Sequence, residues 1–271
     1  MNTLAARRRH PAAIAVLLFL GLLVTGLAYA ALAPREASAT ASTAVAADDV
    51  AQGKKLFQAN CASCHGLNAT GTTSPTTDGI AGPSLVGVGA AAVDFQMGTG
   101  RMPLAAPNVQ AARNPKVLFS QEEIDQVAAY VASLGPGPAV PESKYTDGST
   151  GNPGRGGEIF RVNCAMCHNA VGAGGALTRG KYAPTLNGVS NKHIYEAMET
   201  GPQSMPVFND TNLDPQAKAD VISYLNSLHK EGNPGGYGLG SLGPVPEGLF
   251  AWTIGLTLMV AAAVWLGSKS A

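Results

Sequence analysis

The sequence predicts an all-α protein in which two similar units lie between two apolar segments. Three observations support this prediction: a cysteine-containing motif that occurs twice, an amphipathic helix pattern at the end of each unit, and long uncharged runs near both ends of the chain. The 271 residues leave room for two small domains, but not for one large enzyme with further domains. Neither unit shows the alternation of polar and apolar residues that is typical of strands, so we expect no sheet.

An internal repeat defines the two units. The Cys, Phe, Asn and His positions of the two copies match at an offset of 103 residues. The first copy reads Gly53-Lys54-Lys55-Leu56-Phe57-Gln58-Ala59-Asn60-Cys61-Ala62-Ser63-Cys64-His65, and the second reads Gly156-Gly157-Glu158-Ile159-Phe160-Arg161-Val162-Asn163-Cys164-Ala165-Met166-Cys167-His168. Shorter matches follow, in which Gly82-Pro83-Ser84-Leu85 corresponds to Ala183-Pro184-Thr185-Leu186, and Arg101-Met102-Pro103 corresponds to Ser204-Met205-Pro206.

Each unit is predicted to open with a helix that enters its cysteine motif and to close with an amphipathic helix. In the first unit Ser120 and Glu123 form a capping box, and apolar residues then recur at helical spacing from Ile124 to Leu134. In the second unit Asp214 is the expected N-cap, with Pro215 at the first helical position. These signals predict that both units are helical.

The uncharged runs at the two ends predict membrane-associated segments. Residues 11–34 carry no charge, follow three arginines and are long enough to cross a bilayer, although two A-x-A sites within 28–33 are plausible cleavage sites. Residues 1–34 are therefore either a signal peptide or an N-terminal anchor. Residues 248–268 predict a transmembrane helix, with Trp252 and Trp265 near its ends and Lys269 after it. Both assignments place the central part of the chain outside the cytoplasm.

Composition gives the boundaries that we expect along the chain. The first unit covers residues 48–135 and the second covers 153–231, and the C-terminal membrane helix covers 248–268. Segments rich in Pro, Gly, Ser or Ala separate them: a linker at 35–47, a linker at 136–152 and a Gly/Pro hinge at 232–247. We expect these three segments to be flexible or semi-extended.

The charge balance argues against nucleic acid as a partner. Lys and Arg total 18, and Asp and Glu also total 18, so the formal net charge is zero. A general nucleic-acid-binding protein needs an excess of positive side chains to neutralise phosphates. We therefore expect no nucleic-acid partner.

The cysteines indicate covalently bound haem. All four lie in two C-x-x-C-H motifs, Cys61/Cys64/His65 and Cys164/Cys167/His168, which is the attachment signature of c-type haem. A disulfide would not require the histidine, a thioredoxin-like dithiol would need a βαβ context, and a zinc site would need ligands from two distant motifs. The sequence therefore predicts two c-type haems, with His65 and His168 as axial ligands of the iron.

Met102 and Met205 are the predicted second axial ligands. They occupy matching positions in the repeat, and each precedes a proline, which sets a non-helical backbone that can hold the sulfur facing inward. Met97 in the first unit and Met198 and His193 in the second are alternatives, but His193 has no counterpart in the first unit. Ligation by His and Met raises the reduction potential of haem, which suits an electron carrier.

Two prolines are predicted to orient the histidine ligands. The carbonyl groups of Pro83 and Pro184 can accept a hydrogen bond from Nδ1 of His65 and His168, which fixes the tautomer that presents Nε2 to iron. An iron with both axial positions filled has no open site for a substrate. We therefore expect electron transfer and no catalytic residues in this chain.

These motifs resemble class I cytochrome c domains over residues 48–134 and 153–229. The whole arrangement, with an N-terminal apolar segment, two such domains, a Gly/Pro hinge and one C-terminal membrane helix, is similar to the dihaem cytochrome c subunit of the actinobacterial cytochrome bc1 complex, a menaquinol–cytochrome c reductase. The resemblance implies two tandem cytochrome c domains on the extracytoplasmic side of the cell membrane. The complex would act as an oxidoreductase and translocase, and this chain would be its electron-transfer subunit.

The resemblance also implies the partners. Electrons would arrive from a Rieske iron–sulfur protein that is reduced at a cytochrome b subunit, and they would leave to a haem–copper cytochrome c oxidase. The chain would belong to a dimeric complex. Three other functions remain open: a dihaem subunit of a different membrane oxidase, a dihaem peroxidase with one five-coordinate iron, and the electron-accepting subunit of a periplasmic dehydrogenase. The paired Met102 and Met205 argue against the peroxidase.

Overall fold

The computed structural model of the chain describes residues 11–32, 47–73, 80–106, 108–230 and 244–269. The three arginines that precede the N-terminal apolar run lie outside the described residues, as do nearly all of the 35–47 linker and most of the 232–247 hinge. The chain divides into two compact units, Met1–Thr43 and Ala44–Ala271. The first contains helix α2 (Pro11–Leu32), and the second contains both cytochrome-like domains and the C-terminal helices.

The first domain is built from four helices around one hydrophobic core. They are α3 (Ala47–Asn60), α4 (Ala62–His65), α5 (Gly89–Gly98) and α6 (Gln121–Ala132). The capping box of Ser120 and Glu123 at the start of α6 is confirmed. The α3 helix crosses α6 at Gly53, where a Cβ atom would lie 1.8 Å from the carbonyl oxygen of Gln126. Phe57 of α3 is fully buried beside Tyr130 of α6, so the first and last helices of the domain make its core.

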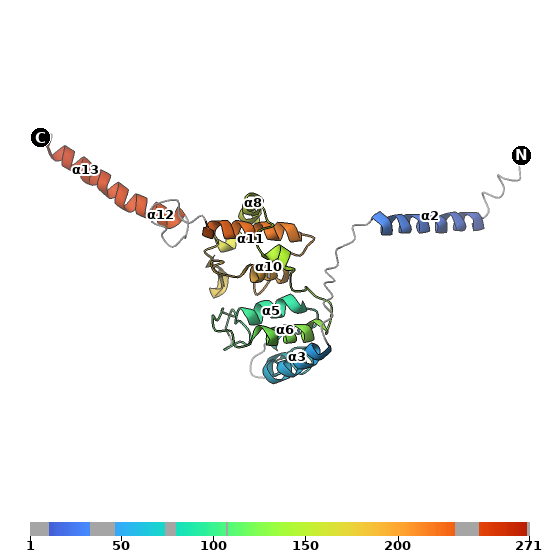
Figure 1. Cartoon of the computed structure of the whole chain (residues 1–271). Coiled ribbons are helices and arrows are strands. Elements are labelled where there is room, and N and C mark those ends of the chain that lie inside the picture. The colour runs from blue at the N-terminus through green and yellow to red at the C-terminus, as the bar shows by residue number, and fades with distance from the viewer. Residues whose placement is uncertain (1–10, 33–46, 74–79, 107, 231–243, 270–271) are drawn as a thin grey trace, which may run out of the picture. The chain divides into compact units, whose positions relative to one another are not determined.

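The second domain repeats this arrangement (Figure 1). Its helices are α8 (Pro153–Asn163), α9 (Ala165–His168), α10 (Asn191–Thr200) and α11 (Pro215–Lys230). The α8 helix crosses α11 at Gly156, where a Cβ atom would lie 1.9 Å from the carbonyl oxygen of Asp220. Asp214 accepts a hydrogen bond from the Ala217 amide at 2.7 Å, as expected of an N-cap. The matching glycines, Gly53 and Gly156, therefore mark the same helix crossing in both domains.

Short strands correct the expectation that neither unit contains a sheet. In the first domain β1 (Thr72–Thr73) pairs with β2 (Ile80–Gly82), and in the second β3 (Gly175–Ala176) pairs with β4 (Tyr182–Ala183). Both pairs are antiparallel and follow the cysteine motif. Strands of two or three residues are too short to leave a periodic pattern in the sequence, which explains why they were not predicted. The domains remain mostly helical.

The 136–152 segment, which the sequence predicts to be flexible or semi-extended, contacts both domains. The Pro138 carbonyl accepts a hydrogen bond from the Ala91 amide at 3.1 Å in the first domain. A short helix, α7 (Ser143–Thr146), then places Tyr145 against the core of the second domain, where its ring stacks on Tyr195 with centroids 6.3 Å apart. The Gly and Pro content suggested a linker, but the single aromatic residue anchors the segment.

The two domains contact each other through α5 and α10. Lys192 at the start of α10 forms an ion pair with Asp94 of α5, with Nζ 2.6 Å from Oδ2. A second contact joins Gln110 to the backbone of Tyr182, and a third joins the Ala111 amide to the Gln203 side chain at 3.3 Å.

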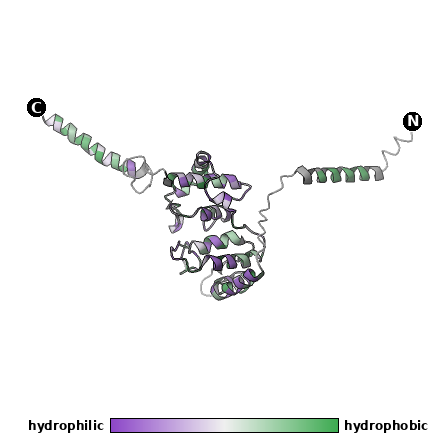
Figure 2. Ribbon diagram, viewed as in Figure 1, coloured by the Kyte–Doolittle hydropathy of each residue, from purple (hydrophilic) through white to green (hydrophobic). Residues whose placement is uncertain are grey.

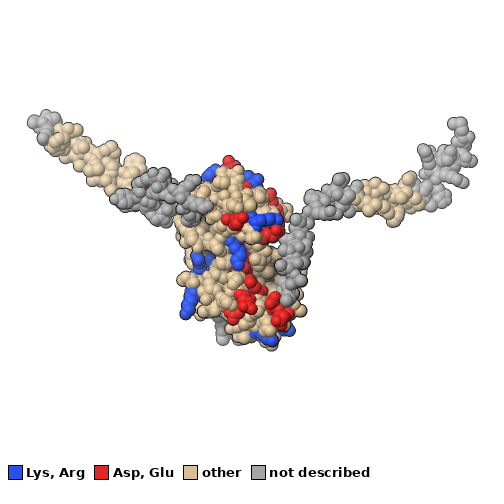
Figure 3. Space-filling model, viewed as in Figure 1, with Lys and Arg blue, Asp and Glu red and all other residues tan. Residues whose placement is uncertain are grey.

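The C-terminal helix is long and apolar enough to span a membrane. It consists of α12 (Pro244–Phe250), a π-helical turn (Ala251–Gly255) and α13 (Leu256–Lys269). Its apolar span, Pro246–Ser268, is 23 residues long and has a mean hydropathy of 2.0, and none of it is buried against the rest of the chain. Figure 2 shows this helix as mainly hydrophobic, and Figure 3 shows no charged side chain along its drawn part. The shorter apolar stretch in α2 is Ala15–Leu27.

Candidate haem sites

In the first domain the motif cysteines and histidine lie on one helical turn. Cys61 precedes α4, and Cys64 and His65 lie within it. Nδ1 of His65 is 2.8 Å from the carbonyl oxygen of Pro83, so this ring nitrogen donates a hydrogen bond and Nε2 is left to bind another group. The adjacent Gly82 gives the backbone room here, because a Cβ atom would lie 3.0 Å from the same Nδ1 and 2.5 Å from the Cys64 carbonyl oxygen.

The second motif has the same local geometry. Cys164 precedes α9, which contains Cys167 and His168. Nδ1 of His168 lies 3.0 Å from the carbonyl oxygen of Pro184. Burial lowers the pKa of His168, and the hydrogen bond to Pro184 opposes this shift only in part. The ring is therefore held neutral, which is the state in which imidazole binds a metal.

None of the four motif cysteines forms a disulfide. Burial, followed by the charge of the second cysteine in the motif, raises the pKa of Cys61 and of Cys164 to about 11. The two cysteines of each motif are close enough to interact, since Cys64 contributes to the pKa shift of Cys61 and Cys167 to that of Cys164. Each motif thus presents two neighbouring thiols and one neutral imidazole, the donor set that covalent c-type haem needs.

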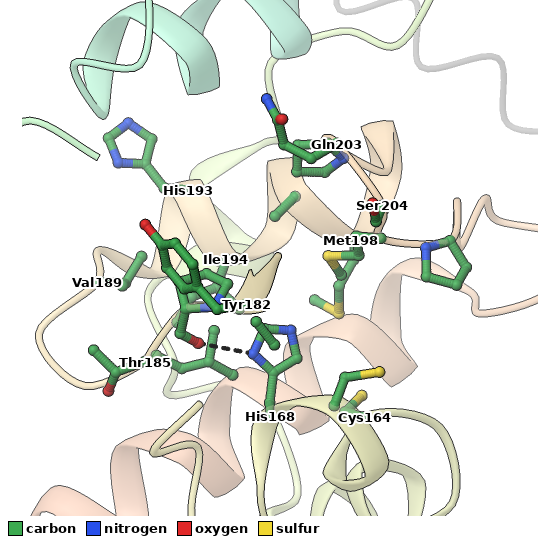
Figure 4. Close-up of a pocket in the computed structure, with 18 of the residues that line it drawn as sticks. Cys164, His168, Tyr182, Thr185, Val189, His193, Ile194, Met198, Gln203 and Ser204 are labelled. Carbon is green, nitrogen blue, oxygen red and sulfur yellow. Dashed lines mark hydrogen bonds between the residues drawn. The ribbon is translucent and has the colours of Figure 1, made fainter. Parts of the chain in front are cut away.

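A mostly apolar cavity opens beside the second motif. Figure 4 shows Cys164, His168 and Met198 around it, and His193 at its edge with the ring turned away from His168. Met205 also lines the cavity, together with Leu186, Ile194 and Pro206. The residues that the sequence assigns to the second haem are therefore brought to one cavity: Cys164, Cys167, His168, Pro184 and Met205.

The structure separates the methionine alternatives by position. Met97 in α5 and Met198 in α10 are buried in the two hydrophobic cores. Met102 and Met205 lie in the non-helical loops that follow these helices and are only partly buried against the same cores. Met102 packs on the core cluster that Cys61 also contacts, and Met205 on the cluster that Cys164 contacts. Met102 and Met205 therefore keep the equivalent positions that the repeat predicts.

The first domain contributes part of the wall of the second cavity, which the sequence did not predict. Phe95, Thr99, Arg101, Gln110 and Arg113 all line it. The guanidinium carbon of Arg101 lies 4.9 Å from the centre of the Phe95 ring, and only 8% of Arg101 is exposed. Arg101 is also the residue before Met102. A predicted iron ligand of the first domain is thus one residue away from the cavity of the second.

The residues present fit covalently bound haem. A flat, largely apolar macrocycle needs an apolar cavity, two thiols on one side and a neutral imidazole whose second nitrogen is already hydrogen-bonded. The second domain provides all three around one cavity, and the first domain repeats the thiols, the imidazole and the hydrogen bond to a proline carbonyl.

Comparison with known protein families identifies both domains as cytochromes. Residues 50–135 match the cytochrome c family. Residues 151–225 match a family described as cytochrome c oxidase, cbb3-type, subunit III. Each matched range contains one C-x-x-C-H motif together with its predicted methionine, so c-type haem is implied for both domains.

Similarity to characterised proteins extends over nearly the whole chain. The chain is 43% identical to the cytochrome bc1 complex cytochrome c subunit of Mycobacterium leprae, an alignment that covers 94% of this chain and 87% of that protein. It is 42% identical to the subunit of the same name in Corynebacterium efficiens, with 97% and 90% covered. For Corynebacterium diphtheriae the identity is 41%, with 98% and 97% covered. The similarity therefore includes both domains and both apolar segments.

Proposed function

The chain belongs to the family of actinobacterial cytochrome bc1 complex cytochrome c subunits, and from this membership we propose that it relays electrons from a Rieske iron–sulfur protein to a haem–copper cytochrome c oxidase. In this role it is the electron-transfer subunit of a quinol–cytochrome c oxidoreductase that also contains cytochrome b, within a dimeric complex. The chain itself performs no substrate chemistry. It takes the place of a soluble cytochrome c between the two enzymes.

The residues that would hold the two haems are the two repeated sets. Cys61 and Cys64 would bind the first haem covalently, with His65 and Met102 on its iron, and Cys164 and Cys167 would bind the second, with His168 and Met205. When bound, the haems supply reversible one-electron transfer. The carbonyl groups of Pro83 and Pro184 keep the imidazoles in one tautomer and orientation.

The observation that carries the proposal of a relay within the chain is the shared wall of the second cavity. Arg101 contacts that cavity and is bonded to Met102, so protein atoms alone connect the two sites. The buried Arg101, which packs on the Phe95 ring, also places a positive charge in this region. The first domain therefore builds part of the second site, as expected if electrons cross between them.

The tethering of the chain supports permanent docking to its partners. The apolar span Pro246–Ser268 would lie in the cell membrane, with both haem domains on the extracytoplasmic side. Positive and negative side chains are interspersed on the face shown in Figure 3. A domain without a large field of one sign gains little from electrostatic steering, whereas a membrane anchor raises its effective concentration beside its partners.

Substitution of one ligand set tests the serial relay. His168→Ala or Met205→Ala should perturb the second haem, leave the first domain haem-loaded and abolish quinol-driven oxygen uptake by membranes. Val162→Ala is a suitable control, because Val162 lies in α8 two residues before Cys164, is 81% exposed and does not line the cavity. Normal oxygen uptake in either ligand variant, with the second haem lost, would contradict a relay through both domains.

A further inference from the structure

Three potential metal ligands from both domains converge where α5 packs against α10. Asp94 comes from α5, and His193 and Glu196 come from one face of α10. Nε2 of His193 lies 3.9 Å from Oδ1 of Asp94 and 4.0 Å from Oε2 of Glu196. One ligand atom from each residue lies within 4.8 Å of the other two. None of the three belongs to the residues proposed to hold haem.

The cluster is buried, and three of its polar atoms have no hydrogen-bond partner among the described residues. Glu196 is 0% exposed and Asp94 is 1% exposed. Neither carboxylate oxygen of Glu196 has a hydrogen-bond partner within the described part of the chain, and the same is true of His193 Nε2. Native proteins rarely leave such groups unsatisfied, because a polar group that is buried without a partner loses its hydration with no compensation. A single cation between them would satisfy all three atoms.

The charges around the cluster also favour a bound cation, because only one of its two carboxylates pairs with a lysine in the described part of the chain. Lys192 pairs with Oδ2 of Asp94 at 2.6 Å, which compensates one carboxylate. Oδ1 of Asp94 faces His193 at 3.9 Å and also accepts a long hydrogen bond of 3.5 Å from Nε2 of Gln121. Among the described residues no lysine or arginine forms an ion pair with Glu196, and the charge of nearby Lys192 offsets its burial only in part. Burial, followed by the charge of Asp94, raises the pKa of Glu196 to about 9. A carboxylate in this position needs either a proton or a metal ion.

We propose that Asp94, His193 and Glu196 bind a Zn²⁺ ion between the two domains. One imidazole nitrogen and two carboxylate oxygens are a donor set that zinc accepts, whereas Mg²⁺ and Ca²⁺ prefer oxygen ligands throughout. Ligand atoms at about 2.0–2.2 Å from a tetrahedral ion lie roughly 3.3–3.6 Å from one another. The separations of 3.9 and 4.0 Å need to shorten by only a few tenths of an ångström. Three protein ligands leave one position for water.

Gly98 provides the space for this ion. It is the last residue of α5, one helical turn after Asp94. A Cβ atom there would lie 2.7 Å from Nε2 of His193 and 3.3 Å from Oδ1 of Asp94. A side chain at this position would therefore occupy the space between the ligands. Gly98→Ala would obstruct the site while leaving all three ligands in the chain.

The ion would link the two domains thermodynamically. It takes one ligand from the first domain and two from the second, so it binds well only when α5 and α10 are in contact. A ligand that binds only one arrangement stabilises that arrangement. Zinc would therefore stabilise the domain contact through which Arg101 reaches the second cavity.

The test uses the full-length, haem-loaded chain in detergent. The protein is treated with a chelator, dialysed and titrated with ZnCl₂ by calorimetry, and bound zinc is then counted against haem iron by mass spectrometry. We expect one saturable zinc per chain. Glu196→Gln and His193→Ala should each weaken binding roughly tenfold or more, since loss of even an indirect partner of a metal ligand costs about 10–100-fold. Gly98→Ala should weaken it similarly.

Two controls make the result specific. Glu122→Gln removes an exposed carboxylate from the first turn of α6 and should leave zinc binding unchanged. MgCl₂ in place of ZnCl₂ should give no saturable binding at the same concentration. The proposal is overturned if the wild-type chain takes up no stoichiometric zinc, or if the affinity is the same in Glu196→Gln, His193→Ala and Gly98→Ala. Haem content, followed in the same samples, shows that each variant is folded.

Discussion

Gln110 of the first domain and Tyr182 of the second are joined by two hydrogen bonds. Nε2 of Gln110 donates to the Tyr182 carbonyl oxygen at 2.9 Å, and the Tyr182 amide donates to Oε1 of Gln110 at 2.9 Å. A single side chain thus satisfies both backbone groups of Tyr182, much as a neighbouring strand would. Both residues line the cavity of the second domain. The contact therefore fixes one wall of that cavity to the first domain.

Gln110→Ala should loosen this wall. Each hydrogen bond contributes about 0.5–1.5 kcal/mol, so loss of both should raise the exchange rate of the Tyr182 amide by roughly tenfold. Hydrogen exchange of the full-length chain, read by mass spectrometry of peptides containing residue 182, measures this. Asn108→Ala is the control, because its side chain accepts only from the adjacent Val109 amide. Equal exchange at Tyr182 in Gln110→Ala and wild type would show that the contact does not persist in solution.

Substitution of the glycine at either helix crossing, Gly53 or Gly156, should destabilise only the domain that contains it. An added Cβ would collide with a backbone carbonyl at either position, at 1.8 and 1.9 Å, and backbone cannot move aside as a flexible side chain can. We expect Gly53→Ala to cost about 1–3 kcal/mol or more in the first domain only, and Gly156→Ala to do the same in the second. Hydrogen exchange of α3 and α6 against α8 and α11 measures each domain separately. Lys54→Ala, an exposed neighbour, should have little effect; an equal effect would exclude a steric cause.

Replacement of the buried Lys218 should lower the free energy of unfolding of the second domain by a large amount. Its side chain is 0% exposed and forms ion pairs with Glu199 and with Asp210. Lys218→Met keeps most of the volume but leaves both carboxylates without their cation. Removal of one partner from a buried pair costs about 3–5 kcal/mol, and we expect the lower end because Asp210 is 52% exposed and can be hydrated. Thermal unfolding of the second domain measures the cost, with Lys116→Met, at an exposed position, as the control.

The assignment of Met205 predicts a change in one reduction potential. Met205→Ala should lower the midpoint of one of the two haems, because methionine ligation raises the potential of haem iron. Met198→Leu should leave both midpoints nearly unchanged, since Met198 packs in the core of the second domain and leucine keeps the apolar surface that it presents to the cavity. A redox titration of the full-length chain followed by absorbance measures both. A shift in Met198→Leu without one in Met205→Ala would reverse the assignment.

The features that were predictable from the sequence are those encoded by local pattern. The capping box at Ser120, the N-cap at Asp214 and the C-terminal apolar helix each depend on residues close together in the chain, and each is present in the structure. The helices entering the cysteine motifs were also predicted, because the motif itself sets their ends. The repeat then extended these signals from one domain to the other.

The features that were not predictable depend on contacts between distant segments. Asp94, His193 and Glu196 are ordinary polar residues in sequence, and only the packing of α5 against α10 brings them together. The helices α5 and α10 themselves were missed, although Ser190 before α10 is a recognisable N-cap that accepts from the His193 amide. The contribution of Arg101 to the second cavity likewise required the structure.

The most direct test of the relay is to purify this chain with its partners from the native membrane. The chain is tagged, the membrane is solubilised in a mild detergent, and reduced-minus-oxidised spectra and oxygen uptake of the purified material are recorded. We expect b-type and a-type haem bands beside the c-type band, together with oxygen uptake driven by quinol. A c-type band alone, or one accompanied only by a dehydrogenase and without quinol-driven uptake, would contradict the proposed position between the bc1 complex and the oxidase.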